Sequence, residues 1–243
     1  MPRAPLYKEV KDKLVAALVG GEWKAGDKVP IESQLAHRYS VGVATIRTAV
    51  GELEAAGILA RRQGKGTFVA DHSSERTIDR FFNLVRADGA RLIPSREFVS
   101  LRRVRGSAHE QSALQLTRYP GPPFIFRIRT TISVEDRCIG VSDVSVPAAL
   151  FPGLTRAGII DGSVALYALY QKNFNVTVVS VSADLTAESA PVDVAVLLGT
   201  TAGIPLLRID RMAYTYNSVP VELRHSWVRT GEYKFHVSQN QTV

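Results

Sequence analysis

Residues 30–69 read PIESQLAHRYSVGVATIRTAVGELEAAGILARRQGKGTFV, and this stretch decides the fold of the first part of the chain. Its apolar spacing predicts a short helix over residues 31–39 and a second over residues 43–56, joined by a tight turn at residues 40–42. Gly57 supplies the left-handed residue at which a helix commonly stops, and a basic hairpin follows. This order is typical of a winged helix-turn-helix, whose second helix can enter the major groove of DNA while the hairpin contacts phosphates.

A further helix is predicted before this unit, over residues 7–19. Leu6, Val10, Leu14 and Leu18 recur at helical spacing and share one face. This apolar stripe gives the short helix and the second helix a surface to pack on, so the first part of the chain can form a core of its own.

The charge of the chain is unevenly distributed. Of 243 residues, 30 are Lys or Arg and 23 are Asp or Glu, which gives a net charge of +7 and a pI of about 9.7. The first 70 residues hold 11 of the basic and 7 of the acidic residues, so this short segment carries more than half of the excess. A basic balance favours a polyanionic partner, although many basic proteins bind no nucleic acid.

Several classes of protein are disfavoured by what the sequence lacks. Cys138 is the only cysteine, which excludes an intrachain disulfide and a zinc site built from cysteines. No apolar run approaches the ~18 residues of a membrane span, and the N-terminus lacks the apolar core of a signal peptide. We therefore expect a soluble protein of the cytoplasm with no metal, no other cofactor and no membrane partner.

The chain divides at a polar stretch without periodicity, DHSSERT at residues 71–77. This composition predicts a linker between a DNA-binding domain over residues 1–70 and a second domain over residues 78–243. A surface loop within one domain is the alternative.

The second domain alternates strands with a few helices. SAHE at residues 107–110 is a capping box that opens a helix, and residues 163–172 and 191–198 predict two more. Residues 174–185 have an extended pattern. The order of elements indicates an α+β domain built around an antiparallel sheet.

Two predicted hairpins, over residues 124–146 and 206–228, resemble each other. A shift of 82 residues superposes Gly121 on Gly203 and Arg129 on Arg211, and a helix precedes each hairpin. A duplicated helix-hairpin unit would build one sheet with a pseudo-two-fold axis and a cleft between its halves. A chance match of so few residues is the alternative.

The first part of the chain resembles the DNA-binding domain of the GntR family of bacterial transcription regulators. The likeness is carried by PLYKEVKDKL at residues 5–14 and by the stretch from AGDKVP to RRQGKGTFV at residues 25–69. The rest resembles the effector domain of the HutC subfamily, the UTRA domain. The residues that carry this second likeness are RFFNLVRADGARLIPSREFVSLRRV (80–104), LFPGL (150–154), LLGTTAGIPLLRIDR (197–211) and PVELRHSWVRTGEYKF (220–235).

The resemblance implies a fold and partners. The fold is α+β, with an N-terminal winged helix-turn-helix domain and a C-terminal antiparallel-sheet effector domain of chorismate-lyase-like type. The implied partners are a second copy of the chain, an inverted repeat in double-stranded operator DNA, and a small anionic metabolite. Since effectors in this family generally lower the affinity for DNA, we expect a metabolite-responsive transcriptional repressor.

DNA contacts are expected from the start of the second helix of the unit and from the hairpin tip. The guanidinium of Arg47 can reach two guanine acceptors or a phosphate, and the hydroxyls of Thr45 and Thr48 can donate to phosphates. Lys65 supplies charge at the tip, where glycines permit a close approach. The predicted DNA-binding residues are Gln34, Ala44, Thr45, Arg47, Thr48, Arg62, Gln63, Gly64, Lys65 and Gly66.

Effector contacts are expected in the second domain. Arg127 and Arg129 alternate with apolar residues and so share one face of a strand, which makes a paired cationic site for a carboxylate or phosphate. The resemblance adds a Ser-x-Tyr at a helix start, matched loosely here by Ser163 and Tyr167, and a glutamate in the last hairpin, Glu222. The predicted effector-binding residues are Arg127, Arg129, Ser163, Tyr167, Glu222 and Trp227.

Three alternatives remain open at this point. The two strand arginines could pair with acids of the protein itself, such as Asp210. The chain could bind DNA constitutively, without an effector. A lyase-like enzyme is the third class, but the sequence offers no set of nucleophile, base and acid and no metal-ligand spacing, so no catalytic residue is predicted.

Overall fold

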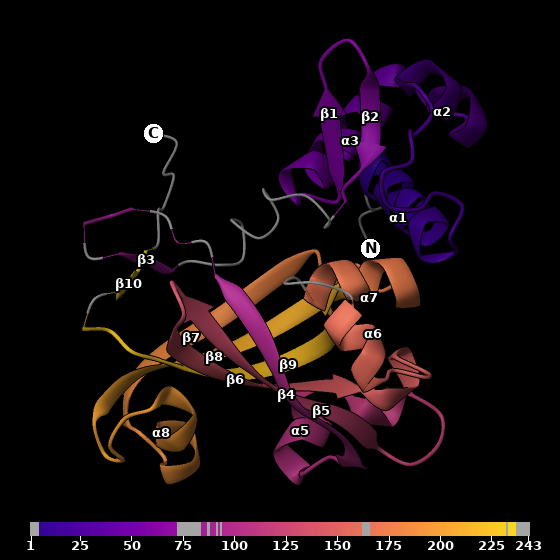
Figure 1. The fold of residues 1–243 in the computed structure, drawn as a ribbon. Helices are drawn as coiled ribbons and strands as arrows, with labels where there is room; N and C mark the ends of the chain where they lie inside the picture. Colours follow the sequence, from indigo (N-terminus) through magenta and orange to yellow (C-terminus); the bar gives the residue numbers. More distant parts are fainter. Residues whose placement is uncertain are drawn as a thin grey trace.

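The computed structural model describes residues 5–71, 84–86, 88–90, 92, 94–161, 166–231 and 233–236. The N-terminal unit, residues 5–71, packs its helices beside a two-stranded hairpin that projects from them as the wing (Figure 1). Its elements are α1 (Leu6–Val19), α2 (Glu32–Tyr39), α3 (Val43–Ala55), β1 (Leu59–Arg62) and β2 (Gly66–Val69).

The apolar faces of these helices form one core. Ile46 and Leu53 of α3 are fully buried and cluster with Leu14 of α1 and Leu35 of α2. The apolar spacing that predicted the helices therefore also supplies the surface that holds them together, which stabilises short helices more than propensity does.

Backbone geometry at the ends of the helices matches the turn signals. Gly57 has a φ of 67°, and the next amide, that of Ile58, donates to the Leu53 carbonyl 2.9 Å away. Ser40 has a φ of 53° and ends α2. Gly42 is extended and precedes α3 as its N-cap. The predicted winged helix-turn-helix is confirmed.

The wing depends on its glycines. β1 and β2 are antiparallel and pair Arg62 with Gly66, while Gly64 and Gly66 have φ values of 70° and 110°. A Cβ atom on Gly66 would lie 2.8 Å from Cε of Lys28. The tip therefore needs glycine for its conformation, since the flexible end of Lys28 could move away from an added Cβ atom.

Six strands of the C-terminal part form one antiparallel sheet in the order β4-β5-β6-β9-β8-β7. A separate antiparallel pair joins β3 to β10. The strands are β3 (Leu84–Arg86), β4 (Ser95–Arg105), β5 (Phe124–Val134), β6 (Arg137–Pro147), β7 (Ser180–Ser189), β8 (Pro205–Thr215), β9 (Val219–Val228) and β10 (Tyr233–Phe235).

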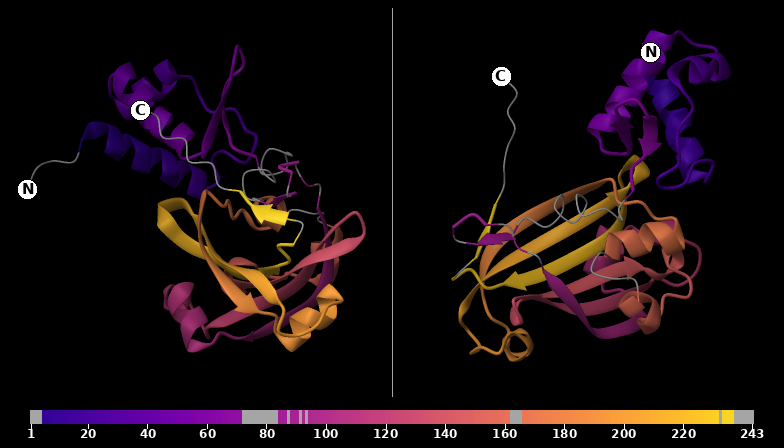
Figure 2. Two further views of the ribbon diagram at one scale, coloured as in Figure 1. Left: turned by 90° about the vertical axis from the view of Figure 1, so that its left-hand side faces the viewer. Right: turned by 45° about the horizontal axis from the view of Figure 1, so that its top comes forward.

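Helices cover both faces of this sheet (Figures 1 and 2). α6 (Arg156–Asp161) and α7 (Leu166–Phe174) pack on one face around Ile128, and we call this the inner face. α5 (Ala108–Ala113) and α8 (Val192–Leu198) pack on the opposite, outer face. Short 3-10 turns occupy Leu116–Arg118, Ala148–Leu150 and Tyr216–Ser218.

The sheet has the two-fold pattern that the repeat predicted. The first half contributes β4, α5, β5 and β6, and the second half contributes β7, α8, β8 and β9 in the same order. The last strands of the halves, β6 and β9, pair with each other at the centre of the sheet. Gly121 and Gly203 both have positive φ, 88° and 85°.

The predicted shift of 82 residues is wrong by one residue for β5 and β8. β5 begins at Phe124 and β8 at Pro205. Because side chains alternate between faces, a slip of one residue moves each of them to the other face. Arg129 consequently lies on the outer face beside Asp143, whereas Arg211 lies on the inner face near Tyr167.

Some predicted elements have different bounds. The helix predicted over residues 163–172 is α7 (Leu166–Phe174), since residues 162–165 lie outside the described part, and the extended segment becomes strand only at Ser180. β4 and α6 were not predicted. Of the predicted linker, only Asp71 is described. No helix in the described part of the chain has the length and apolarity needed to cross a bilayer.

The N-terminal unit and the sheet domain touch at α7, and Figure 1 shows α7 next to α1. Nε2 of Gln171 donates to the Ala70 carbonyl at 3.0 Å and to Oγ1 of Thr177 at 3.1 Å. Val179 and Tyr216 join the apolar cluster of the N-terminal unit. The end of the wing is thus tied to the helix that covers the inner face.

The predicted capping box forms at the start of α5, and its glutamate also accepts hydrogen bonds from residues of the sheet. The Ser107 amide donates to Glu110 at 2.8 Å, and Ser107 Oγ accepts from the Glu110 amide at 3.3 Å. Glu110 also accepts from Arg127 of β5 and Ser145 of β6. Burial acts to raise the pKa of Glu110, but these hydrogen bonds outweigh it and lower the pKa to about 2.

Replacing Glu110 by Gln should therefore destabilise the fold in a pH-dependent way. At pH 7 we expect the free energy of unfolding to fall by on the order of 2–3 kcal/mol. The pKa of Glu110 in the folded state is below its ordinary value of 4.5, so the stabilisation is present above pH 4.5 and lost as the pH falls towards 2. Denaturant unfolding at pH 7 and pH 3 measures this difference.

Glu135→Gln is the matched control, because Glu135 is an exposed carboxylate that pairs only with exposed Arg86 among the described residues. A difference between wild type and Glu110→Gln that is the same at both pH values would contradict the assigned role of the carboxylate.

Candidate functional site

The wing and the starts of α2 and α3 enclose a groove of about 620 Å³ on the N-terminal unit. Ile31, Val43 and Gln63 line it, together with backbone of the glycines at the wing tip. A helix start and a cationic hairpin on the two sides of one groove are the parts that dock on a duplex.

Most of the predicted DNA-binding residues are exposed, and four of the ten, Arg62, Gln63, Gly64 and Gly66, line this groove. Gln34, Ala44, Arg47 and Thr48 are exposed on α2 and α3, and Thr45 is half-buried. On the wing, the exposed residues are Arg62, Gln63, Gly64 and Lys65, with Gly66 half-buried.

Two of these side chains already make local hydrogen bonds. Thr48 Oγ1 donates to the Ala44 carbonyl of its own helix at 3.1 Å, and Gln34 Oε1 accepts from the Ile31 amide at 3.2 Å. Their remaining groups face solvent. These local side-chain to backbone bonds fix the orientation of the two side chains.

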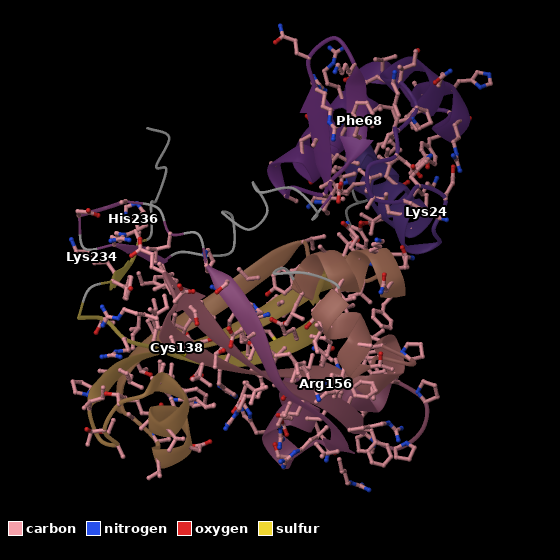
Figure 3. All side chains as sticks on the ribbon, in the orientation of Figure 1. Lys24, Phe68, Cys138, Arg156, Lys234 and His236 are labelled. Carbon is pink, nitrogen blue, oxygen red and sulfur yellow. The ribbon has the colours of Figure 1, made fainter. Side chains whose placement is uncertain are left out.

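On the wing, Arg62 lies over an aromatic ring. Its Cζ is 4.6 Å from the ring centroid of Phe68, which Figure 3 labels on β2. This cation–π contact supports the guanidinium from one side. Lys65, at the turn, donates its backbone amide to the Arg62 carbonyl, so its side chain extends from a closed turn.

A second site lies on the inner face of the sheet, under α7. Glu222 of β9 is fully buried, and it accepts hydrogen bonds from the hydroxyls of Tyr167 at 3.1 Å and Tyr170 at 2.7 Å. Arg224 of the same strand donates Nε and Nη2 to the two carboxylate oxygens at 2.9 and 3.0 Å. Tyr167 and Glu222, both predicted, are thus brought together.

The inner face carries more cations than this carboxylate neutralises. Arg96 of β4 buries Nε and Nη1 without a hydrogen-bond partner in the described part, and Arg211 of β8 does the same with Nε. The hydroxyl of Thr130 on β5 is also buried and has no hydrogen-bond partner in the described part of the chain. Arg211 and Arg224 stand directly opposite each other in the ladder. We call Arg96, Thr130, Tyr167, Tyr170, Arg211, Glu222 and Arg224 the inner-face cluster.

The inner-face cluster combines one buried carboxylate with buried arginine nitrogens. Burial acts to raise the pKa of Glu222, but Arg224 and the two tyrosines outweigh it, so this pKa is lowered and the group is a carboxylate at neutral pH. Burial, with a contribution from Arg224, lowers the pKa of Arg96 to about 10. Burial also raises the pKa of Tyr170, which therefore remains a hydrogen-bond donor.

The other predicted effector residues do not belong to this cluster. Arg127 and Arg129 point to the outer face, where Arg127 pairs with Glu110 and Arg129 pairs with Asp143 and Asp193. Arg127 and Arg129 share one face, as predicted, but it is the face opposite to Glu222, because residues of odd number on β5 face away from the inner side. Ser163 lies outside the described residues.

Trp227 is also an outer-face residue. It packs among the residues around α8, and its indole Nε1 donates to Glu188 at 2.9 Å. Five positions separate it from Glu222 on one strand, an odd number that puts the two on opposite faces. Asp210, which the sequence offered as an acid for the strand arginines, instead binds His225 and Arg208.

The outer-face ion pairs line a polar cavity of about 570 Å³ between α5 and α8. Its three ion pairs join two arginines, Arg127 and Arg129, to three carboxylates, so these pairs carry no excess of positive charge, in contrast to the inner-face cluster. No group of three or more His, Cys, Asp or Glu in the described part is arranged to hold a metal ion.

Five members of the inner-face cluster were not predicted from the sequence. Arg224 follows Glu222 by two residues, so strand alternation already placed both on one face. Arg211 and Thr130 need the correct register of the repeat. Arg96 lies on an unpredicted strand. Tyr170 is one helical turn after Tyr167, a spacing that brings both over the same carboxylate.

Comparison with protein families assigns both parts of the chain. Residues 6–69 match the bacterial regulatory proteins of the gntR family, and residues 90–234 match the UTRA domain. The α+β fold class, with a winged helix-turn-helix and an antiparallel-sheet domain, agrees with both.

Relatives across the length of the chain are named as regulators. The probable fructoselysine utilization operon transcriptional repressor of Escherichia coli K12 is 26% identical over 235 residues, covering 92% of this chain and 90% of that protein. The HTH-type transcriptional regulator Rv0792c of Mycobacterium tuberculosis is 27% identical and covers 98% of this chain and 87% of its own length. The histidine utilization repressor of Pseudomonas aeruginosa is 36% identical over 88 residues, 36% of this chain and 35% of that one.

Solved structures share the fold. The ligand-binding domain of a putative GntR-family transcriptional regulator from Bordetella bronchiseptica superposes with a TM-score of 0.62 at 30% identity, covering 66% of this chain and 98% of that one. PhnF from Mycobacterium smegmatis covers 96% of this chain and 99% of its own length, with a TM-score of 0.55 at 21% identity.

Proposed function

The chain belongs to the GntR family of DNA-binding transcription regulators and carries a UTRA domain, and we propose that it is a repressor released from DNA by an anionic metabolite on the inner face of its sheet. Two copies engage the two halves of an inverted repeat, each with its wing and α3. The protein works in the cytoplasm and has no catalytic role.

The observation that carries the effector proposal is the charge of the inner-face cluster. Among the described residues, three arginines, Arg96, Arg211 and Arg224, surround one carboxylate, Glu222, which leaves a formal excess of two positive charges. Buried cations without a partner are unfavourable, and a bound dianion satisfies both charge and hydrogen bonds. A phosphate ester or a dicarboxylate has the required charge.

Glu222 and the tyrosines give the site a second specificity. The carboxylate lies between the hydroxyls of Tyr167 and Tyr170, so a ligand hydroxyl or amine that reaches it exchanges one hydrogen bond for another. A metabolite with an anionic end and a hydroxyl or amino group therefore fits better than an inorganic anion. The names of two relatives, repressors for the utilization of fructoselysine and of histidine, support regulation by small metabolites.

Communication with DNA is proposed to pass through α7. Tyr170 belongs to the inner-face cluster and donates to Glu222. Its neighbour Gln171 donates to the Ala70 carbonyl at the end of the wing. A ligand that shifts the tyrosines moves the helix on which Gln171 is placed. The effector thereby biases the position of the N-terminal unit, and with it the spacing of two wings in a dimer.

Docking on DNA is tested with Arg47→Ala and Lys65→Ala. Against a duplex that the wild-type protein enriches from a random library, each variant should bind about tenfold more weakly or worse. The slope of log affinity against log salt should fall by about 1 for Lys65→Ala, since a phosphate contact is lost. Fluorescence anisotropy over a range of salt concentrations measures both quantities.

Lys24→Ala is the charge-matched control, because Lys24 lies at the end of the unit away from the wing (Figure 3). If Lys24→Ala weakened binding as much as Lys65→Ala, the docking face would be wrong.

Effector binding is tested with inorganic phosphate as the minimal dianion. At ten times its Kd, phosphate should stabilise the wild type by about 1.4 kcal/mol, a rise in Tm of about 2–4 °C. Arg96→Gln and Arg211→Gln should lose this response, since each removes a cation from the inner-face cluster. Arg127→Gln, an outer-face change of the same kind, should keep it. If only Arg127→Gln lost the phosphate-dependent rise in Tm, the effector site would lie on the outer face instead.

Communication is tested with Gln171→Leu, which removes the donor to Ala70. The variant should keep the phosphate-dependent rise in Tm, whereas the reduction of DNA affinity by phosphate should become several-fold smaller than in wild type. Asn173→Ala, an exposed change on the same helix, is the control. An unaltered ligand effect in Gln171→Leu would refute this route. A wild type whose DNA affinity no anion alters would instead support constitutive binding.

A further inference from the structure

Two cationic side chains of the DNA-binding face converge on one carboxylate. Glu32, the first residue of α2, accepts Nε of Arg47 through Oε2 at 3.0 Å and Nη2 of Arg61 through Oε1 at 3.2 Å. Arg47 belongs to α3 and Arg61 to β1 of the wing. One acidic residue therefore links the recognition helix to the wing.

These ion pairs contribute little to the stability of the fold. The arginine side chains are 66% and 54% exposed, and exposed pairs of this kind are weak. Glu32 itself is only 25% exposed, because it lines the groove between the wing and the helix starts. Its effect is on orientation: each oxygen fixes the direction of one guanidinium.

The geometry of the Arg47 contact leaves the useful end of that side chain available. Glu32 takes Nε, at the inner edge of the guanidinium, and within the described chain Arg47 has no second hydrogen bond. Both terminal nitrogens of this exposed side chain thus keep their hydrogens for another partner, and such a fork can recognise the two acceptors of guanine or a phosphate. Arg61 is held from two sides, by Glu32 and by Glu54 through Nε at 3.2 Å.

A carboxylate on this surface also has a cost for binding. Phosphates of any duplex are repelled by it, and it reduces the net positive charge that drives binding without sequence preference. A group that both orients a base-reading arginine and repels phosphates raises specific over non-specific affinity.

We propose that Glu32 is a positioning residue for specificity: it presents the Arg47 fork at a fixed distance from the wing and weakens binding to unrelated DNA. This inference rests on the proposed docking of the wing and α3 on DNA. In this proposal the start of α2 helps the protein to discriminate between DNA sequences without contacting the DNA directly.

The test compares two duplexes of equal length, one enriched from a random library by the wild-type protein and one with the same bases shuffled. Glu32→Gln should bind the enriched duplex about tenfold more weakly and the shuffled duplex about two- to threefold more tightly. The ratio of affinities then falls by more than tenfold. Glu22→Gln removes an equivalent carboxylate from the pair with Arg38 and should leave the ratio unchanged.

A second background separates positioning from a general effect of charge. In an Arg47→Ala protein, adding Glu32→Gln should change the ratio by less than twofold, since the side chain being oriented is gone. Circular dichroism and the Tm of each variant report whether it is folded, and Glu32→Asp, which keeps the charge, should recover part of the ratio.

Equal tightening of both duplexes by Glu32→Gln would overturn the proposal and leave only a charge effect. A full loss of ratio by Glu32→Gln in the Arg47→Ala background would also overturn it, because Glu32 would then act through another residue. A wild type that enriches no duplex and binds both alike would overturn DNA docking itself, a result distinct from either.

Discussion

An excess of buried positive charge on the inner face of the sheet is the constraint on which the C-terminal domain depends. Glu222 is held by four hydrogen bonds from Arg224 and two tyrosines, while Arg96 and Arg211 bury guanidinium nitrogens that these bonds do not satisfy. Desolvating such groups costs several kcal/mol unless an opposite charge is present. Among the described residues the site thus has an excess of positive charge, and this excess is the basis of the proposed anion binding.

One helix connects that site to the rest of the molecule. α7 provides Tyr167 and Tyr170 to the carboxylate and, one residue later, provides Gln171 to the last carbonyl of the wing. Consecutive residues of a helix point about 100° apart, so neighbours in sequence can face two different domains. A helix of nine residues is thus long enough to touch both sites that the proposed regulation requires.

The winged helix-turn-helix was predictable because its signals are local. Helical spacing, the stop at Gly57 and the glycines of the wing each act within a few residues, and each appears in the structure at the expected place. The hairpins β5-β6 and β8-β9 were predictable for the same reason. β4 was not, since this strand at the sheet edge is rich in arginine and shows no clean alternation of apolar residues.

The effector site was only partly predictable, because it depends on long-range register. Arg127 and Arg129 satisfied the rule that alternate residues share a face, but the rule does not say which face is covered by α7. Sequence spacing placed Glu222 and Arg224 together, whereas Arg96 lies on β4, which β5 and β6 separate from β9 in the sheet. A shift of one residue in the repeat was enough to exchange the two faces.

The doubled architecture of the sheet has a consequence for how its chemistry could diversify. Superposing the halves strand by strand puts Thr130 where the second half has Arg211, and Ser142 where it has Arg224. Two half-length chains related by a strict axis would have had to change such positions in pairs. Because both halves belong to one polypeptide, one half can carry small hydroxyl side chains where its counterpart carries charge. A ligand with two unlike ends can then be recognised by a sheet of pseudo-two-fold symmetry.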